Sequence, residues 1–178
     1  MKETLLINIF GGPSIGKTDC ARDLANLLGR QGFVSEYVPE FAKKLVWSQS
    51  FPTLRNQVFV TAGQFNDLLM VYGQVDYIVT DSPVLTGIAF PGVCCTPAWE
   101  AHVLEMHHHF KHVNFLLERN LAYYQAEGRV QTPKECLIAD RRLEDFLAQH
   151  HIAYQRLFSA SSPAQAAMQS LMSTHNRT

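Results

Sequence analysis

The earliest residues in the chain that suit a chemical role form one short turn, residues 11–18. They are Gly11, Gly12, Pro13, Ser14, Ile15, Gly16, Lys17 and Thr18, which fit the pattern G-x-x-x-x-G-K-[ST] at every position. The apolar run 5–10 predicts a strand before the turn, and apolar spacing over 19–30 predicts a helix after it. Such a turn directs several backbone N–H groups and the positive end of the helix at one point. We therefore interpret residues 11–18 as a phosphate-binding loop, because a chance glycine turn would not explain both flanking elements.

Three polar side chains at or near this loop suit a nucleotide with its metal ion. Lys17 can reach the β- and γ-phosphates of ATP, and the Thr18 hydroxyl can ligate Mg²⁺. Asp81 directly follows the apolar run 75–80, which predicts a buried central strand. An acidic residue at that position is the expected partner of Mg²⁺, directly or through water. Asp81 also suits the turn before Pro83 as a helix cap, and the two roles are compatible.

Two glutamates bring carboxylates towards the same edge of the predicted sheet. Residues 33–38 predict a second strand, Pro39 ends it, and residues 40–47 predict a helix. The carboxyl ends of parallel strands form the ligand crevice of open α/β sheets, which places Glu36 and Glu40 beside the phosphate loop. We favour a functional role for Glu40 over a solvated surface position, whereas for Glu36 both interpretations stay open.

A polar segment at about 119–132 suits a lid over the reacting phosphate. It follows the predicted fourth strand, 113–117, and contains Arg119 and Arg129. Phosphoryl transfer needs cationic groups near the γ-phosphate and the exclusion of water. An exposed connecting loop is the equally supported alternative.

A cluster of histidines, His107, His108 and His109, lies near the end of a helix predicted at 97–110. His108 and His112 have the i, i+4 spacing of metal ligands, but the following strand ends the helix before His112. No cysteine or carboxylate completes a ligand set. We therefore expect a solvated histidine cluster and no metal site there.

The remaining segments complete a single predicted α/β domain over residues 1–178. The helix predicted at 54–72 carries Gln64 and Asn66, which we expect on its solvated face. The last elements follow as a helix, a strand and a helix. The sequence predicts loops at 51–53 and 84–96, helices at 134–150 and 164–172, and a strand at 152–158.

Length and composition are those of an ordinary globular chain, with 178 residues, 47% of them apolar and 17% charged, and a formal net charge of −1. This charge gives no general attraction to nucleic acid, so such contact would need a local basic patch. The first strand leaves no room for a signal peptide, and no apolar run is long enough to span a bilayer. We expect a cytoplasmic protein with no membrane partner. Its cysteines lack C-x-x-C spacing, which indicates reduced thiols; they are Cys20, Cys94, Cys95 and Cys136.

Together these motifs resemble those of the P-loop nucleoside and nucleotide kinase group, which is thymidylate kinase-like. The resemblance rests on the phosphate loop and on three further motifs: Glu36-Tyr37-x-x-Glu40, Asp81-Ser82-Pro83 and the segment from Arg119 to Arg129. Two subfamilies are most similar. One is the small kinases of bacterial viruses, including those that phosphorylate 5-hydroxymethyluridine already in DNA during thymidine hypermodification. The other is the ribosylnicotinamide kinases.

The resemblance implies a three-layer α/β/α P-loop kinase fold with a five-stranded parallel sheet in the order 2-3-1-4-5. It implies ATP as phosphate donor and Mg²⁺ as its partner. It also implies that Glu40 or Asp81 handles the acceptor hydroxyl, and that Arg119 and Arg129 belong to the lid.

One departure from the kinase pattern bears on the acceptor. Related kinases often carry an arginine directly after the acid of the third strand, whereas this chain has Ser82. We therefore favour a neutral hydroxyl over an acceptor phosphate, with Glu36, Glu40 and Ser82 on the acceptor side. The first expectation is a hydroxymethyl base in viral DNA, which would place the chain in the host cytoplasm. The second is a small nucleoside, nucleotide or ribosylnicotinamide.

Other functions compatible with the phosphate loop are an NTPase switch or motor and a nucleotide-binding module without chemistry. The intact Lys17, Thr18 and Asp81 argue against the module, and a motor would depend on oligomer contacts, which remain possible. A DNA acceptor would require cationic contacts to the flanking phosphates. The candidates for those contacts are Lys43, Lys44 and Arg55.

Overall fold

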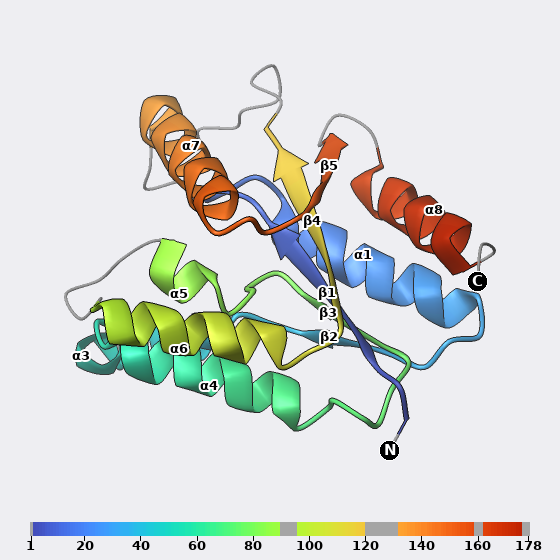
Figure 1. Cartoon of the computed structure of the whole chain (residues 1–178), viewed down its shortest axis with the longest axis horizontal. Helices are drawn as coiled ribbons and strands as arrows, with labels where there is room; N and C mark the ends of the chain where they lie inside the picture. Colours follow the sequence, from blue (N-terminus) through green and yellow to red (C-terminus); the bar gives the residue numbers. More distant parts are fainter. Residues whose placement is uncertain (1, 90–95, 120–131, 159–161, 176–178) are drawn as a thin grey trace.

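The computed structural model describes residues 2–89, 96–119, 132–158 and 162–175. Within these residues five strands form one parallel sheet in the order β2-β3-β1-β4-β5 (Figure 1). This result confirms the sheet and the strand order that the resemblance implies. The strands are β1 (Leu5–Phe10), β2 (Ser35–Val38), β3 (Tyr77–Thr80), β4 (His112–Glu118) and β5 (Gln155–Phe158).

Helices cover both faces of the sheet, so the fold has the predicted three layers (Figure 1). Helices α1 (Lys17–Arg30) and α8 (Pro163–His175) pack against each other on one face. On the other face lie α4 (Gln57–Leu69), α5 (Thr86–Ala89), α6 (Pro97–His108) and α7 (Pro133–Gln149). Two shorter helices, α2 (Phe41–Trp47) and α3 (Phe51–Leu54), pack against α4.

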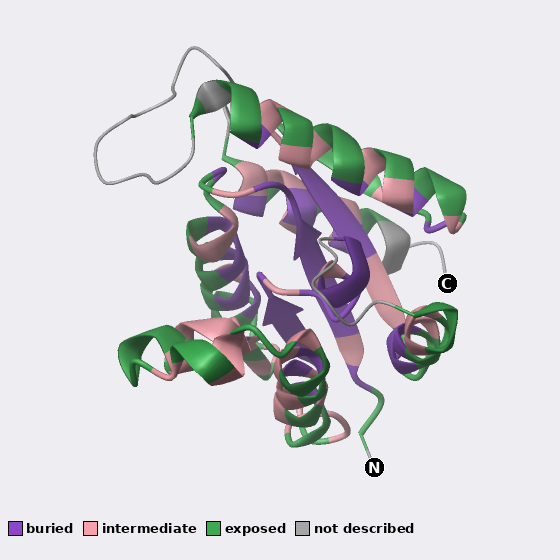
Figure 2. Ribbon diagram, turned by 90° about the vertical axis from the view of Figure 1, so that its left-hand side faces the viewer, coloured by how far each residue is buried: buried purple, intermediate pink, exposed green. Residues whose placement is uncertain are grey.

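Alternation along the central strand β1 produces the two apolar layers. Ile7 and Ile9 pack in one cluster with residues of α1 and α8, while Leu6 and Phe10 belong to clusters on the opposite face. All four side chains are at most 1% exposed, and Figure 2 shows the strands as the buried centre of the molecule. Burying each such side chain stabilises the fold by roughly 1.5–3 kcal/mol. The sheet is therefore a rigid frame whose carboxyl edge carries the loops.

Two predicted loops were wrong in part, because each contains a short helix. Residues 51–53 fall within α3, whose first turn holds Pro52; proline is well tolerated there because no N–H donor is needed. The segment 84–96 contains α5, although residues 90–95 lie outside the described part. Helix α5 packs closely on α4, since a Cβ at Gly87 would lie 2.0 Å from the Thr61 hydroxyl. Whether such a short helix forms depends on tertiary packing of this kind, which the local sequence does not show.

Cys20 and Cys136 are buried free thiols, and burial raises the pKa of Cys20 to about 12. Cys94 and Cys95 lie outside the described residues. No helix within the described ranges is long and apolar enough to cross a membrane.

Candidate functional site

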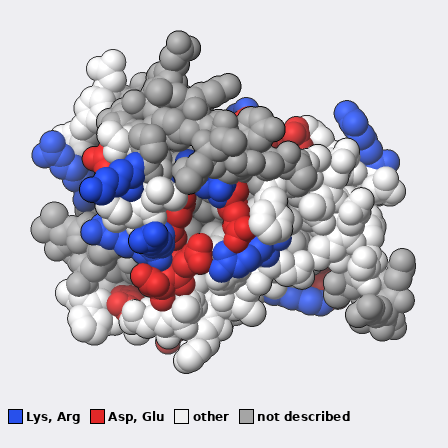
Figure 3. All heavy atoms as spheres, turned by 90° about the horizontal axis from the view of Figure 1, so that it is seen from above, with Lys and Arg blue, Asp and Glu red and all other residues white. Residues whose placement is uncertain are grey.

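A pocket of about 910 Å³ opens at the carboxyl edge of the central strands. The phosphate loop forms one side of it, and residues from α2, α3, α4 and α5 form the other. Figure 3 shows acidic and basic side chains gathered around the hollow on this face of the molecule. The pocket therefore combines charged groups with the loop that the sequence assigns to phosphate binding.

The phosphate loop has the backbone conformation that the sequence motif requires. Gly16 caps α1 with a φ of 94°, in the left-handed region that glycine adopts without steric cost. No side chain caps the helix, so its first N–H groups are directed towards the loop. Lys17 folds back across the loop, and its Nζ donates to the Gly12 carbonyl at 2.8 Å. The loop backbone and the Lys17 side chain are thus held together by the loop's own carbonyl.

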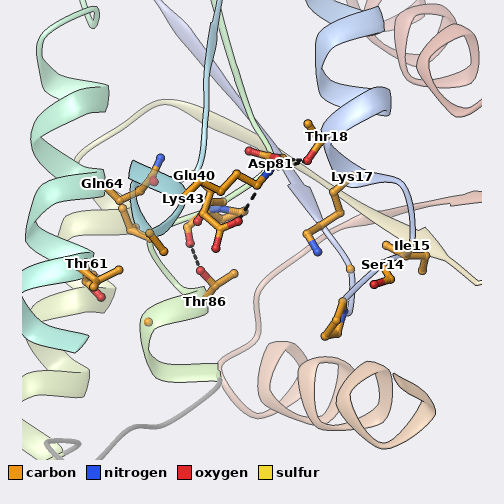
Figure 4. Close-up of a pocket in the computed structure, with 18 of the residues that line it drawn as sticks. Ser14, Ile15, Lys17, Thr18, Glu40, Lys43, Thr61, Gln64, Asp81 and Thr86 are labelled. Carbon is orange, nitrogen blue, oxygen red and sulfur yellow. Dashed lines mark hydrogen bonds and ion pairs between the residues drawn. The ribbon is translucent and has the colours of Figure 1, made fainter. Parts of the chain in front are cut away.

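The charge of Lys17 is set by the pocket around it. Burial lowers the pKa of Lys17, and the nearby Glu40 and Asp81 carboxylates oppose that shift. Both acids line the same pocket as the lysine (Figure 4). The two acids therefore favour the charged form of Lys17, the form that attracts phosphate.

Thr18 and Asp81 meet directly beside the loop. The Thr18 hydroxyl donates to Asp81 Oδ2 at 2.5 Å, and the Lys43 ammonium lies 2.9 Å from the same hydroxyl and 3.1 Å from Asp81 Oδ2. Asp81 is only 3% exposed, its other oxygen, Oδ1, is buried, and the Tyr37 hydroxyl also interacts with this carboxylate. Figure 4 shows the Lys43 side chain reaching towards this carboxylate.

The oxygens of this cluster fit a magnesium ion. Mg²⁺ prefers hard oxygen ligands and is commonly held by one or two protein groups plus phosphate oxygens. Thr18 and Asp81 provide a hydroxyl and a carboxylate beside the phosphate loop, a donor set of that kind. The Lys43 ammonium contacts both of these groups.

Glu40 stands at the start of α2 and opens into the pocket. Its side chain is 41% exposed, and Glu40 Oε2 lies 3.8 Å from the Lys43 ammonium. The helix that follows is anchored by Gln64, whose Oε1 accepts the Phe41 backbone N–H at 2.7 Å. Gln64 thereby positions the backbone next to Glu40.

The expectation that Gln64 lies on a solvated face was wrong, while its neighbour Asn66 is exposed as expected. Gln64 is 3% exposed and lines the pocket together with Thr61. With Leu68 these two residues form the buried face of α4. Thr61, Gln64 and Leu68 are spaced by three and four residues, so they share one side of the helix. Polar residues on the same side as a buried leucine could have indicated that this side lines a pocket.

Arg119 is fixed against the phosphate loop. Its Nη2 donates to the Pro13 carbonyl at 2.7 Å, and its Nε donates to Asp140 Oδ2 on α7 at 2.8 Å. The Arg119 side chain is 6% exposed, and it lies behind the phosphate loop rather than among the residues that line the pocket. A Cβ at Gly12 would lie 1.9 Å from Asp140 Oδ1, which explains the glycine at that position.

Asp140 is a residue that sequence reasoning missed. It lies four residues after Cys136 and three before Leu143, both fully buried, so it falls on the apolar stripe of α7. An acidic residue on such a stripe indicates a buried partner. Arg129, the second arginine of the predicted lid, lies outside the described residues, as do positions 120–131 as a whole.

The other acceptor-side candidates separate into two groups. Ser82 lines the pocket, directly after Asp81. Glu36 is exposed on β2, the strand at one end of the sheet, and is not among the residues that line the pocket. The structure therefore brings Glu40 and Ser82 to the phosphate loop and leaves Glu36 at the surface.

The histidine cluster differs from the solvated cluster expected. His108 and His109 are exposed, but His107 is 1% exposed and neither of its ring nitrogens has a hydrogen-bond partner. His107 is buried because it lies on the same side of α6 as the buried Val103 and Met106. No group of three or more His, Cys, Asp or Glu side chains suited to a metal ion occurs among the described residues.

Solved structures share this architecture. The chain is similar to deoxyadenosine kinase from M. mycoides, determined with dCMP and dCDP, with a TM-score of 0.62 and 14% identity over 95% of this chain and 100% of that one. It is also similar to shikimate kinase from Aquifex aeolicus, with a TM-score of 0.55 and 11% identity over 97% and 98% of the two chains. Shikimate kinase from Bacteroides thetaiotaomicron gives a TM-score of 0.56 and 13% identity over 94% and 98%. At these identities the likeness shows a common fold, the P-loop kinase α/β fold.

Sequence comparison gives a family. No curated protein sequence matches the chain. The family of AAA domains designated AAA_28 matches residues 6–164, from β1 into α8. Since this match covers most of the chain, the protein belongs to the AAA_28 family of AAA domains.

Proposed function

We propose that this chain is an ATP-dependent kinase that transfers the γ-phosphate to a neutral hydroxyl of a nucleoside-type acceptor, acting as a single domain. One observation carries the proposal. The Glu40 carboxylate lines the same pocket as the phosphate-loop Lys17, and its Oε2 lies 3.8 Å from the Lys43 ammonium that contacts Thr18. A phosphate donor site and a base for an acceptor hydroxyl are thus joined in one cavity.

The donor half of the pocket suits ATP. The backbone of residues 11–18 surrounds the phosphates, and the Lys17 ammonium stabilises the charge that develops on the β- and γ-phosphates. Thr18 and Asp81 would hold Mg²⁺, which when bound neutralises negative charge on the phosphate oxygens. Arg119 already contacts the loop through the Pro13 carbonyl, and we propose that it acts with Arg129 on the donor phosphates.

We propose that Glu40, rather than Asp81, accepts the proton of the acceptor hydroxyl. Asp81 Oδ2 already accepts hydrogen bonds from Thr18 and Lys43, and the residue is buried. The Glu40 carboxylate is the more open of the two. A carboxylate within hydrogen-bond reach of the acceptor hydroxyl removes its proton as the oxygen attacks the γ-phosphate.

The lining of this half supports an acceptor without charge. No arginine occurs among the described residues that line the pocket. A phosphate or carboxylate group on the acceptor would call for such a residue, because arginine binds these groups through two parallel hydrogen bonds. Apart from Glu40 and Lys43, this half is lined by neutral groups, including Leu54, Gln57, Val60, Thr61, Gln64, Ser82 and Thr86. The similarity in fold to a deoxyadenosine kinase also supports a nucleoside-type acceptor.

A transfer assay with γ-labelled ATP and Mg²⁺ tests this proposal. Free nucleosides, ribosylnicotinamide, DNA containing 5-hydroxymethyluracil and unmodified DNA are compared side by side. The proposal predicts label in a nucleoside-type acceptor and none in unmodified DNA. Label in no member of this set would contradict it.

The second candidate acceptor is 5-hydroxymethyluridine within DNA, and an exposed aromatic surface favours it. Trp47 is 80% exposed and Phe51 is 52% exposed, and both belong to the α2–α3 region that leads into the pocket. Lys44 and the exposed Arg55 lie one turn away from these rings along the same helices. Aromatic side chains beside basic groups suit unstacked bases and their phosphates.

Two of the proposed DNA contacts are already engaged within the protein. Lys43 is bound at Asp81, and Lys44 lies 2.5 Å from Asp67 Oδ2. Salt dependence distinguishes the acceptors, because counterion release makes DNA binding weaken steeply with salt. Salt-sensitive transfer to modified DNA supports the DNA acceptor. Salt-insensitive transfer to a free nucleoside, with none to DNA, excludes it.

A further inference from the structure

Lys43 is the lining residue whose position the proposed chemistry does not explain. It lies on α2, one turn after Glu40, yet its ammonium reaches the oxygen cluster beside the phosphate loop. There it contacts Thr18 Oγ1 at 2.9 Å and Asp81 Oδ2 at 3.1 Å, with Glu40 Oε2 at 3.8 Å (Figure 4). The Thr18 and Asp81 oxygens are those that would hold a magnesium ion.

The need for a cation at this point follows from the burial of Asp81. Its carboxylate is 3% exposed, and a buried charge without a partner is strongly unfavourable. Thr18 provides a hydrogen bond but no charge. Lys43 provides the positive charge, and its flexible four-carbon stem allows the ammonium to move without movement of α2.

The neighbouring lysine provides an internal contrast. Lys44 pairs with Asp67 on α4 at 2.5 Å, and its side chain is 51% exposed. Lys43 instead reaches the pocket, where its ammonium lies 3.1 Å from Asp81 Oδ2. Adjacent lysines on one short helix therefore have separate carboxylate partners.

We infer that Lys43 is a resident counter-ion that competes with divalent metal for the Thr18–Asp81 oxygens. In the nucleotide-free protein its ammonium neutralises Asp81 and keeps the affinity for free Mg²⁺ low. Divalent metal then enters together with the nucleotide, whose phosphates add the negative charge that the site needs. This inference rests on the metal position in the proposed function.

Mn²⁺ alone is the probe for this inference, and electron paramagnetic resonance measures the unbound ion. Nucleotide-free full-length protein is titrated with MnCl₂ at fixed ionic strength. Lys43→Gln should bind Mn²⁺ roughly tenfold more tightly than the parent, a difference of about 1.4 kcal/mol. Lys43→Arg keeps the positive charge and should stay near the parent value. Lys43→Met, which retains the apolar stem, is the second neutral variant should Lys43→Gln fail to fold.

Two controls separate this role from a general effect of charge. Lys44→Gln removes one positive charge from the same helix and should leave Mn²⁺ affinity unchanged. Adding Asp81→Asn to Lys43→Gln should abolish the gain. Equal affinities in the parent and the neutral Lys43 variants, an equal gain in Lys44→Gln, or a gain that survives Asp81→Asn would overturn the inference. Absence of phosphate transfer would count against the proposed kinase activity, but it would not change the Mn²⁺ affinities. Failure of the kinase proposal can therefore be distinguished from failure of the inference about Lys43.

Discussion

At the scale of single residues, Lys17 has the most direct role in phosphate chemistry. The Lys17→Ala substitution removes a charge needed most in the transition state, and transfer should fall on the order of 10³-fold. The thermal unfolding temperature should not fall, because the Lys17 ammonium contacts only the Gly12 carbonyl among the described hydrogen bonds. Initial rates and thermal unfolding measure both effects. Near-normal transfer by this variant would contradict a kinase dependent on the loop.

Asp140 is expected to act through Arg119 and not on substrate. Asp140→Asn leaves the guanidinium, which is 6% exposed, without its compensating charge, and such losses commonly cost about 3–5 kcal/mol. Because Asp140 is itself 19% exposed, solvent reduces this cost, and we predict a loss of roughly 2 kcal/mol together with weaker ATP binding. Chemical denaturation and ATP titration measure the two effects. Asp145→Asn, at an exposed position of α7, is the control; equal behaviour of the two variants would refute this role.

At the scale of elements, Gln64 connects α4 to the start of α2. Gln64→Leu leaves the Phe41 N–H without its acceptor, which should cost about 1–3 kcal/mol and displace Glu40. We predict a lower kcat with little change in the KM for ATP, since the phosphate loop is untouched. Steady-state kinetics test this, with Asn66→Ala on the exposed side of α4 as the control. A change confined to the KM for ATP would argue against positioning of the acceptor side.

Helix α6 should make the fold sensitive to acid through His107. Burial, and then the charges of His112 and His108, lower the pKa of His107 from 6.5 to about 3. Below about pH 6.5 His107 is therefore protonated in the unfolded chain but stays neutral in the folded chain. The free energy of unfolding falls as the pH is lowered, because protons bind preferentially to the unfolded chain. Between pH 6.5 and 5 this one group should remove roughly 2 kcal/mol of unfolding free energy.

His107→Phe should abolish that part of the acid sensitivity while keeping an aromatic ring in the same packing. Denaturant unfolding at pH 7 and pH 5 measures it, with His102→Gln on the exposed side of α6 as the control. The pKa of His112 is also lowered, so some sensitivity will remain. Identical pH dependence in the parent and His107→Phe would show that His107 does not resist protonation.

Local patterns predicted the elements better than the partners of their polar residues. Strand and helix types followed from apolar spacing, because that spacing reports which face is buried. Gln64, His107 and Asp140 were misjudged or missed because their environments depend on distant parts of the chain. Gln64 binds Phe41, 23 positions away, and Asp140 binds Arg119, 21 positions away. The average tendency of a residue type to be exposed does not tell which distant group its side chain will contact.

At the scale of the whole molecule, the parallel sheet explains why scattered motifs meet. The phosphate loop follows β1, Glu40 follows β2 and Asp81 follows β3, and these three strands are neighbours in the sheet. Their carboxyl ends lie at one edge, so the three motifs must converge there. The strand order itself came from the resemblance to kinases, because periodicity identifies strands without ordering them. The position of Arg119 against the Pro13 carbonyl depends on Asp140 and thus on the packing of α7, which no local pattern specifies.

The central claim is that ATP turnover by this chain is coupled to a hydroxyl acceptor. The most direct test measures ADP and phosphorylated acceptor in the same reaction, with and without the acceptor found in the labelling assay. The account predicts one phosphorylated acceptor for each ADP formed and far slower ADP formation without acceptor. It also predicts that Glu40→Gln slows both products equally. Equal ADP formation in the presence and absence of every acceptor, with no phosphorylated product, would contradict the account and identify a nucleotide hydrolase.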